Sequence, residues 1–351
     1  MRLVEVANPP NPWSSTEIEY LEAPPTIRLQ VFEDHTKEIL SHNDSPDLGF
    51  SWSVNPYRGC MHGCAYCYAR PSHEYLSFGA GTDFETKIVV KPEAPSLLRA
   101  AFDRRSWKGE LVVFSGVTDC YQPLEASLKL TRGCLEACAE YRNPVGVITK
   151  APLIERDLDV LQELHRHARV HVSVSVPFWD QDKARAVEPY VATPRRRIQA
   201  IEALARAGIP VGVNVAPVIP GLSDQDMPKV LTAAAAAGAT YAGMVMVRLP
   251  GSVKQVFEER IRAALPLQAE RILHRVREVR GGKLYDSRWG TRGRGEGLYA
   301  DATHDLFRAT CQKLGLNSKW GQSETSRYGD PEAPTTFRRP AGRDGQLTLF
   351  D

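Results

Sequence analysis

The residues best suited to chemistry are three cysteines in the segment RGCMHGCAYCYARPSHEY. Cys60, Cys64 and Cys67 have the spacing C-x3-C-x2-C, so three thiols fall within one short loop. Soft thiolates in a reducing compartment bind iron–sulfur clusters or zinc. The loop therefore predicts a metal centre, and the number of thiols bears on which kind.

A structural zinc site needs four closed ligands, which usually come as two separated pairs. Here the three cysteines lie together and no second pair matches them. His62 lies within the first gap and would complete a zinc site only if the loop folded back sharply. Three thiolates suit a 4Fe–4S cluster whose fourth iron stays open to a substrate or cofactor. We favour the cluster and keep zinc, or unclustered structural cysteines, as alternatives.

The composition is that of a soluble globular protein. Of 351 residues, 42% are hydrophobic and 25% are charged, and the net charge of +2 permits nucleic-acid binding without arguing for it. The segment MRLVEVANPPNPWSS carries no secretion signal, and the longest uncharged run, at 230–247, is rich in Ala and Gly. We therefore expect a cytoplasmic protein with no membrane partner and with reduced cysteines.

Short valine-rich runs alternate with amphipathic stretches between about residues 50 and 250. This alternation predicts βαβ units and a parallel sheet. With a first strand near the cysteines there are about six units, so we expect an α/β fold of the partial (β/α)6 TIM-like barrel type. The expected strands are 111–115, 145–149, 170–176, 211–215 and 241–247. The expected helices are 124–141, 153–167, 194–207 and 224–237, two of them capped by Gly208 and Gly238.

Composition divides the chain into four parts. Residues 1–48, rich in Pro, Ser and Asn, are expected to form an irregular extension with one strand at 26–32, and residues 49–250 the barrel. Residues 251–316 form a C-terminal appendage, with a helical segment at about 253–279, a glycine-rich stretch and a helix at 303–314. Residues 317–351 are too poor in apolar residues to fold alone, which predicts a flexible tail.

Further segments extend the pattern beyond the cysteine loop: NPYRGCMHGCAYCYARPSHEYL, DFETKIVV, SGVTDCYQPLE, NPVGVITKAPLIERDLDVL and APVIPGLSD. Together they resemble the radical S-adenosylmethionine (SAM) enzymes, and among these the subgroup similar to spore photoproduct lyase. The resemblance covers about residues 25–310. It implies that Cys60, Cys64 and Cys67 hold a 4Fe–4S cluster and that SAM binds the open iron. An electron, from a donor such as flavodoxin or ferredoxin, then cleaves SAM to a 5′-deoxyadenosyl radical.

The resemblance also implies residues for the charged end of SAM. Lys150 ends the strand VGVITK and resembles the lysine that pairs with the SAM carboxylate. Ser115, Thr118 and Asp119 end another strand, in SGVTD, and resemble the polar stretch that holds the SAM amino group. A solvated strand-end lysine is the alternative for Lys150.

Three more residues are expected near the rest of SAM. Ser173 and Ser175 alternate on VHVSVSV and so face the same side of the sheet, where a hydroxyl suits the ribose. Tyr66 precedes the third cysteine and is expected against the adenine. Satisfied core serines and a solvent-facing tyrosine are the alternatives.

A further cysteine is a candidate for the reaction itself. Spore photoproduct lyase uses a cysteine to return a hydrogen atom to a product radical, and Cys120, in VTDCYQPLE, lies close to the corresponding region. The local similarity places that donor a few residues earlier. Cys120 as hydrogen-atom donor, with Tyr121 as a radical relay, is therefore one prediction, and a buried, inert Cys120 is the other.

The last residues read GQLTLFD. Gln346, Leu347, Leu349 and Phe350 fit the form Q-L-x-L-F, which resembles the short peptide with which bacterial DNA polymerases and repair proteins bind the sliding clamp. A flexible tail with apolar anchors fits a preformed groove. Docking of the tail on a sheet edge of its own domain is the alternative.

Basic and aromatic residues alternate in the glycine-rich stretch: Arg288, Arg292 and Arg294 lie among Tyr285, Trp289 and Tyr299. This composition suits a nucleic-acid groove, and a solvated face is the alternative.

We expect a radical SAM enzyme that abstracts hydrogen from a nucleic acid, with damaged DNA, extruded from its stack, as the leading substrate. The clamp-like peptide and the lyase-like motifs are separate indications of DNA. The first alternative is a radical SAM enzyme that acts on RNA, a peptide or a small molecule. The second is a non-enzymatic iron–sulfur or zinc protein that binds nucleic acid.

Overall fold

The computed structural model describes residues 3–6, 28–318 and 334–340. Its centre is a seven-stranded sheet in the order β11-β10-β9-β8-β7-β4-β3. In this sheet, the neighbours β4, β7, β8, β9, β10 and β11 pair in parallel, and β3 pairs antiparallel with β4 at one edge. The bounds are β3 Leu40–His42, β4 Trp52–Val54, β7 Val112–Phe114, β8 Val145–Thr149, β9 Val170–Ser175, β10 Val211–Val218 and β11 Tyr241–Met246.

This topology confirms the expected α/β fold with six parallel strands. The first strand, β4, lies shortly before the cysteine loop, and the other five lie where the valine-rich runs predicted them. β4 and β11 do not pair with each other in the described residues, so the sheet forms a partial barrel.

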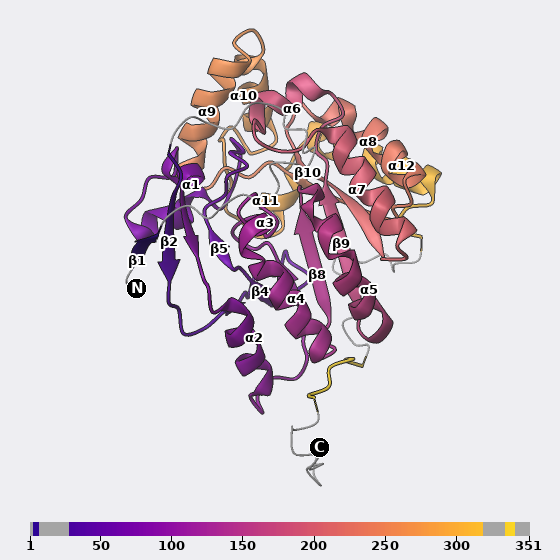
Figure 1. Cartoon of the computed structure of the whole chain (residues 1–351). Coiled ribbons are helices and arrows are strands. Elements are labelled where there is room, and N and C mark those ends of the chain that lie inside the picture. The colour runs from indigo at the N-terminus through magenta and orange to yellow at the C-terminus, as the bar shows by residue number, and fades with distance from the viewer. Residues whose placement is uncertain (1–2, 7–27, 319–333, 341–351) are drawn as a thin grey trace.

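Helices cover one face of this sheet (Figure 1). They are α2 Ala94–Asp103, α4 Leu130–Glu140, α5 Leu158–His167, α7 Pro194–Arg206, α8 Met227–Ala236 and α12 Leu298–Leu314. Their apolar side chains form one continuous cluster with every second residue of the strands, such as Val147, Val172 and Val213. Burial of this cluster is the main driving force for the barrel. Gly208 and Gly238 have φ of 76° and 96°, which confirms them as left-handed caps.

Two of the expected helices are each divided in two. The stretch 124–141 forms α3 Glu125–Leu128 and α4, because the Glu125 carboxylate accepts the backbone N–H groups of Thr131 and Arg132 and so caps α4. The stretch 253–279 forms α9 Val253–Ala264 and α10 Ala269–Glu278, which Pro266 separates. The expected helices at 153–167 and 224–237 begin with the 3-10 turns η2 Pro152–Asp157 and η3 Asp224–Asp226.

A second sheet lies beside the cysteine loop. Its order is β1-β2-β6-β5, with bounds β1 Leu3–Val6, β2 Gln30–Asp34, β5 Tyr57–Arg58 and β6 Lys87–Val90. The strand expected at 26–32 is thus β2, shifted along the chain, and it pairs in parallel with β6 of the DFETKIVV segment. β5 ends two residues before Cys60, so this sheet fixes where the cysteine loop begins. The remaining short elements are η1 Arg70–Leu76, α1 Asp83–Thr86, α6 Gln181–Val187 and α11 Thr291–Arg294.

In the part of the chain that the structure describes, no helix is both long and apolar enough to cross a membrane. The four-part division of the chain stays a prediction.

Candidate active site

The two faces of the parallel sheet differ in chemistry. Val172 and Val174 of β9 belong to the helix-side cluster, so Ser173 and Ser175, which alternate with them, face the barrel interior as expected. The register places Asn214 of β10 beside Ser175 on this interior face. Asn214 is partly exposed whereas the valines of the other face are fully buried, so the interior is the open side of the sheet.

Ser173 already has a partner within the protein. Its hydroxyl donates to the Tyr241 hydroxyl at 3.3 Å, and the Tyr241 hydroxyl in turn donates to the Val172 carbonyl. The ring of Tyr241 reaches across Gly212, where an added Cβ would lie 2.3 Å from it. Ser173 therefore has a structural role here, and the ribose contact of Ser173 and Ser175 stays a prediction.

The three cysteines share one loop, where Cys60 and Cys64 are buried and Cys67 is partly exposed. Burial raises the pKa of the Cys60 thiol to about 12 and that of the Cys64 thiol well above its usual range. In the described residues, no three His, Cys, Asp or Glu side chains converge as ligands of one metal ion. Three thiolates from one loop can each bind a separate iron, so this set of donors fits a 4Fe–4S cluster.

Arg70 holds the backbone of this loop from within the protein. The side chain is fully buried, and its guanidinium donates to the carbonyls of Cys64 at 2.8 Å and Gly63 at 3.2 Å. It also donates to two carbonyls in the turn at 80–81, each at 2.9 Å. Glu85 forms an ion pair with Arg70 and neutralises the buried charge.

Arg260 reaches the same loop from a distant part of the chain. It lies on α9 and donates to the Gly63 carbonyl at 2.7 Å, and it pairs with the same Glu85 oxygen as Arg70. Two guanidinium groups and one carboxylate thus hold the loop backbone. We name Arg70, Glu85 and Arg260 the arginine clamp.

A second buried network ties the loop to β9. The Tyr66 hydroxyl donates to Glu188, which pairs with the buried Arg197. Arg197 also donates to the Ser175 carbonyl at 3.2 Å, at the end of β9. Burial raises the pKa of Glu188, against the opposing effect of Arg197. Tyr66 is therefore fixed between the cysteines and the sheet.

Lys150 lies next to this network. Its Nζ is 5.7 Å from the centroid of the Tyr66 ring, in a cation–π arrangement. The structure thus brings the expected carboxylate-binding lysine to the cysteine loop. A cation there, beside the loop of the three cysteines, fits the SAM carboxylate chemically.

The Asp119 carboxylate joins three segments. It accepts the Thr149 hydroxyl and the Lys150 N–H, each at 2.7 Å, and the Tyr121 N–H at 3.0 Å. His62 of the cysteine loop lies 3.5 Å away. Asp119 therefore holds the ends of β7 and β8 together, and its contact with the SAM amino group stays a prediction.

Thr118 and Gln122 hold the start of the cysteine loop. The Thr118 hydroxyl donates to the Gly59 carbonyl at 2.6 Å, and the Gln122 amide donates to the same carbonyl at 3.1 Å. Gln122 also accepts the Met61 N–H at 3.2 Å. Ser115, the third residue expected at the SAM amino group, accepts the backbone N–H of the residue five positions later at 3.0 Å. These polar side chains thus position the loop in this structure, and their contact with SAM stays a prediction.

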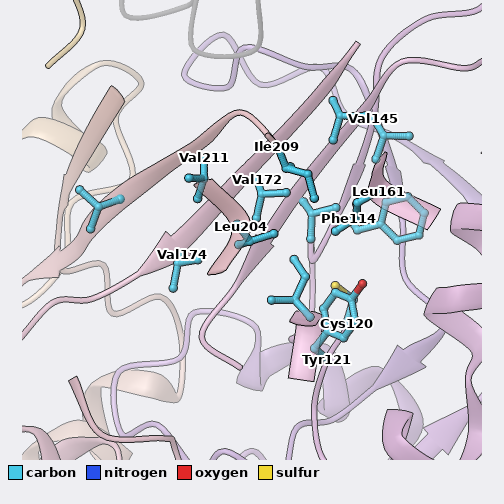
Figure 2. Close-up of a cluster of buried hydrophobic side chains, with 14 of the residues drawn as sticks. Phe114, Cys120, Tyr121, Val145, Leu161, Val172, Val174, Leu204, Ile209 and Val211 are labelled. Carbon is cyan, nitrogen blue, oxygen red and sulfur yellow. The ribbon is translucent and has the colours of Figure 1, made fainter. Parts of the chain in front are cut away.

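Cys120 and Tyr121 lie in the hydrophobic cluster (Figure 2). They are 0% and 1% exposed, and burial raises the pKa of both groups well above the usual range. The Tyr121 hydroxyl donates to Asp157 at 3.1 Å. The role of Cys120 as hydrogen-atom donor, with Tyr121 as a radical relay, stays a prediction, as does the alternative of an inert, buried Cys120. Gln346, Leu347, Leu349 and Phe350 lie outside the described residues.

Sequence reasoning missed the residues that position the loop: Arg70, Glu85, Gln122, Glu188, Arg197 and Arg260. Arg70 and Gln122 lie within motifs that the sequence singled out, so a search for buried donors near the cysteines had a signal to follow. Arg260 lies 196 residues from Cys64 on an ordinary amphipathic helix and gave none.

Comparison with known families gives one match, to the radical SAM superfamily over residues 54–234, which is more than half of the chain. An uncharacterised protein of Mycobacterium tuberculosis is 41% identical over 212 residues, 60% of this chain and 62% of the relative. One of Methanocaldococcus jannaschii is 27% identical over 197 residues, 56% and 71%. The match thus spans about 62% of the length of the mycobacterial relative.

Among solved structures, the fold is similar to that of spore photoproduct lyase. The complex of that enzyme with dinucleoside spore photoproduct has a TM-score of 0.56 at 16% identity, over 82% of this chain and 80% of the lyase. A mutant lyase with bound AdoMet and the same dinucleoside also has a TM-score of 0.56 at 16% identity, with the same coverage. At this identity the likeness shows the fold.

If the arginine clamp holds the loop, Arg260→Met should speed the release of iron from the cluster. The substitution removes a charge-assisted hydrogen bond to Gly63, and a loss of about 1.5 to 3 kcal/mol would speed release of iron roughly tenfold or more. The measurement is the rate of iron transfer to a chelator after anaerobic reconstitution. Arg262→Met is the matched control, because Arg262 lies on the same helix, half exposed, and binds Glu270. Equal rates for the two variants would refute the clamp.

Proposed function

This chain belongs to the radical SAM superfamily, and from that premise we propose that it acts on a nucleic acid, with damaged DNA as its substrate. The superfamily uses a 4Fe–4S cluster and SAM, which together supply a 5′-deoxyadenosyl radical for hydrogen abstraction. Cys60, Cys64 and Cys67 would hold the cluster. An electron donor such as flavodoxin or ferredoxin is part of the proposal.

The substrate class is inferred from two arginines that lie on aromatic rings, one of them beside the cysteine loop. The Arg248 guanidinium lies 5.8 Å from the ring of Tyr68, which follows Cys67, and Arg292 lies 3.5 Å from the ring of Trp289. Cationic and aromatic side chains together bind the phosphates and bases of a nucleic acid. The spore photoproduct lyase structure with dinucleoside spore photoproduct supports the same substrate class.

The interior face would receive the reacting base. Ile148, Asn214 and Val245 of β8, β10 and β11 lie on this face and are partly exposed. A base inside a duplex cannot reach such a face, so the damaged nucleotide has to leave the stack. Lys150 would bind the SAM carboxylate, while Tyr66, held by Glu188, would fix the loop beside it.

The test follows hydrogen from the substrate. The anaerobically reconstituted enzyme is given dithionite, SAM and uniformly deuterated DNA, either ultraviolet-damaged or intact. We expect deuterium in 5′-deoxyadenosine only with damaged DNA, measured by mass spectrometry, because only an extruded base reaches the radical. Cys64→Ala should form no 5′-deoxyadenosine, whereas Cys134→Ala should, because Cys134 is buried in α4, outside the loop.

If 5′-deoxyadenosine forms but contains no deuterium with either DNA, damaged DNA is not the substrate. RNA, a peptide or a small molecule would then be the class to test. Absence of 5′-deoxyadenosine from a fully loaded protein would favour a non-enzymatic metal protein.

We also propose that Gln346, Leu347, Leu349 and Phe350 bind a bacterial sliding clamp, a proposal that rests on the sequence pattern. The nearby segment 334–340 is anchored to residues that precede β7 and β8. The Thr335 hydroxyl donates to the Gly109 carbonyl at 2.6 Å, and Arg339 donates to the Trp107 carbonyl at 3.2 Å. The barrel mouth is the side where the carboxyl ends of the strands lie, and Lys150 follows the carboxyl end of β8. The anchored segment lies at the amino ends of the strands and so leaves the mouth free.

The double variant Leu347→Ala/Phe350→Ala should abolish capture of the full chain by an immobilised bacterial sliding clamp, because both apolar anchors are lost. Thr348→Ala is the control, since Thr348 holds the variable position of Q-L-x-L-F. Surface plasmon resonance measures the binding. No capture of the unmodified chain, or undiminished capture of the double variant, would rule the proposal out.

A further inference from the structure

Two arginines beside the end of β11 each have a buried nitrogen without a partner. Arg248 follows β11 by two residues, and Arg280 follows α10 by two. In the described part of the chain, the Nε atoms of both are buried and find no hydrogen-bond acceptor. Arg280 is 2% exposed and gives its other nitrogens to the carbonyls of Val247 at 2.7 Å and Thr291 at 2.8 Å. Since a buried donor without an acceptor is costly, an acceptor is expected here.

The charges at this point are unbalanced as well. Arg280 donates to the carbonyl of Val247, the residue before Arg248, so the two cations lie near each other. Burial, with a smaller contribution from Arg248, lowers the pKa of Arg280 to about 10. Asp286 and Glu296 act on Arg280 from a distance, but both are in contact with Arg288. Asp47 acts on Arg248 and is in contact with Arg292. The nearby carboxylates are thus engaged elsewhere, and the pair of cations fits an anion.

An exposed aromatic surface lies beside these cations. Trp289 is 53% exposed, and the guanidinium of Arg292 lies 3.5 Å from its ring centroid. Arg292 is fixed in turn by Asp47 and Ser45, and the Gly290 N–H donates to Asp47 at 2.8 Å. The indole is therefore held in place on one side while half of its surface is free. A rigid exposed ring of this kind stacks on a nucleobase.

The cations and the ring are close to the proposed reaction centre. Tyr68 follows Cys67, and its ring lies 5.8 Å from the Arg248 guanidinium. The Tyr68 hydroxyl donates to the Gly116 carbonyl at 2.7 Å, two residues after β7. Tyr68 thus connects the cysteine loop to Arg248. The charge of Arg248 acts on the Asp47 carboxylate. Asp47 in turn binds Arg292, which lies on the ring of Trp289.

We infer that Arg248, Arg280 and Trp289 form a nucleotide subsite at the barrel mouth, in which the two arginines bind a phosphate and the indole stacks on a base. The inference rests on the proposed function and names the part of the substrate that this edge holds. This subsite would bind a nucleotide next to the damaged one, while the damaged nucleotide itself enters the barrel interior. The subsite thus positions a strand and takes no part in the chemical step.

The test uses the full, reconstituted chain and a fluorescein-labelled single-stranded oligodeoxynucleotide, with binding followed by anisotropy at several salt concentrations. Arg248→Gln should weaken binding about tenfold and reduce the slope of log affinity against log salt by about 0.7, because one phosphate contact is lost. Trp289→Ala should weaken binding by roughly tenfold with an unchanged slope, because stacking carries no charge. Arg308→Gln and Tyr75→Ala are matched controls, since both side chains are highly exposed on other elements.

The outcomes separate the subsite from the proposed function. If the unmodified chain binds and both variants bind equally well, the subsite is wrong and the nucleic-acid substrate stands. If the unmodified chain does not bind the oligonucleotide, both are overturned. The SAM carboxylate is the other source of an anion: if Arg248→Gln weakens binding of SAM and not of the oligonucleotide, the arginine serves SAM and the inference is overturned.

Discussion

The buried carbonyl groups of the cysteine loop have to be hydrogen-bonded, and much of the surrounding structure meets this requirement. The loop has neither helix nor strand to satisfy them. Arg70 and Arg260 donate to the carbonyls at 63–64, while Thr118 and Gln122 donate to that of Gly59. Arg70 follows the loop directly, whereas Thr118 and Gln122 follow β7 and Arg260 lies on α9, so the loop acquires its shape only when the barrel and α9 are packed together.

The two faces of the sheet have different roles. Valines on one face pack against the helices and provide stability, whereas the interior face carries Asn214, Ser173 and Ser175. Lys150 joins the site because its strand ends beside Tyr66, whose hydroxyl Glu188 holds. The site is thus built at the point where a regular sheet meets an irregular loop, as in other barrels whose chemistry lies at the carboxyl ends of the strands.

Local patterns predicted much of the fold. The run VGVIT gave the bounds of β8 because a strand buried on both faces is continuously apolar. The break at residue 129 was not predictable, since it depends on the Glu125 carboxylate capping the next helix. For the site, the spacing of the cysteines was sufficient to predict the metal centre. The arginine clamp could not be predicted, because contacts of guanidinium groups with backbone carbonyls leave no repeating pattern in the sequence. For Cys120 the sequence left two interpretations open, and the structure adds that its side chain is fully buried, which no local pattern predicted.

The donors of the cysteine loop fit a cluster with one iron open to SAM. Electron paramagnetic resonance of the dithionite-reduced, reconstituted protein tests it most directly, with spectra recorded before and after addition of saturating SAM. Binding of SAM to an iron of the cluster changes the environment of that iron, so we expect the g values to shift. Spectra that are identical with and without SAM, in a protein with a full complement of iron and sulfide, would contradict it.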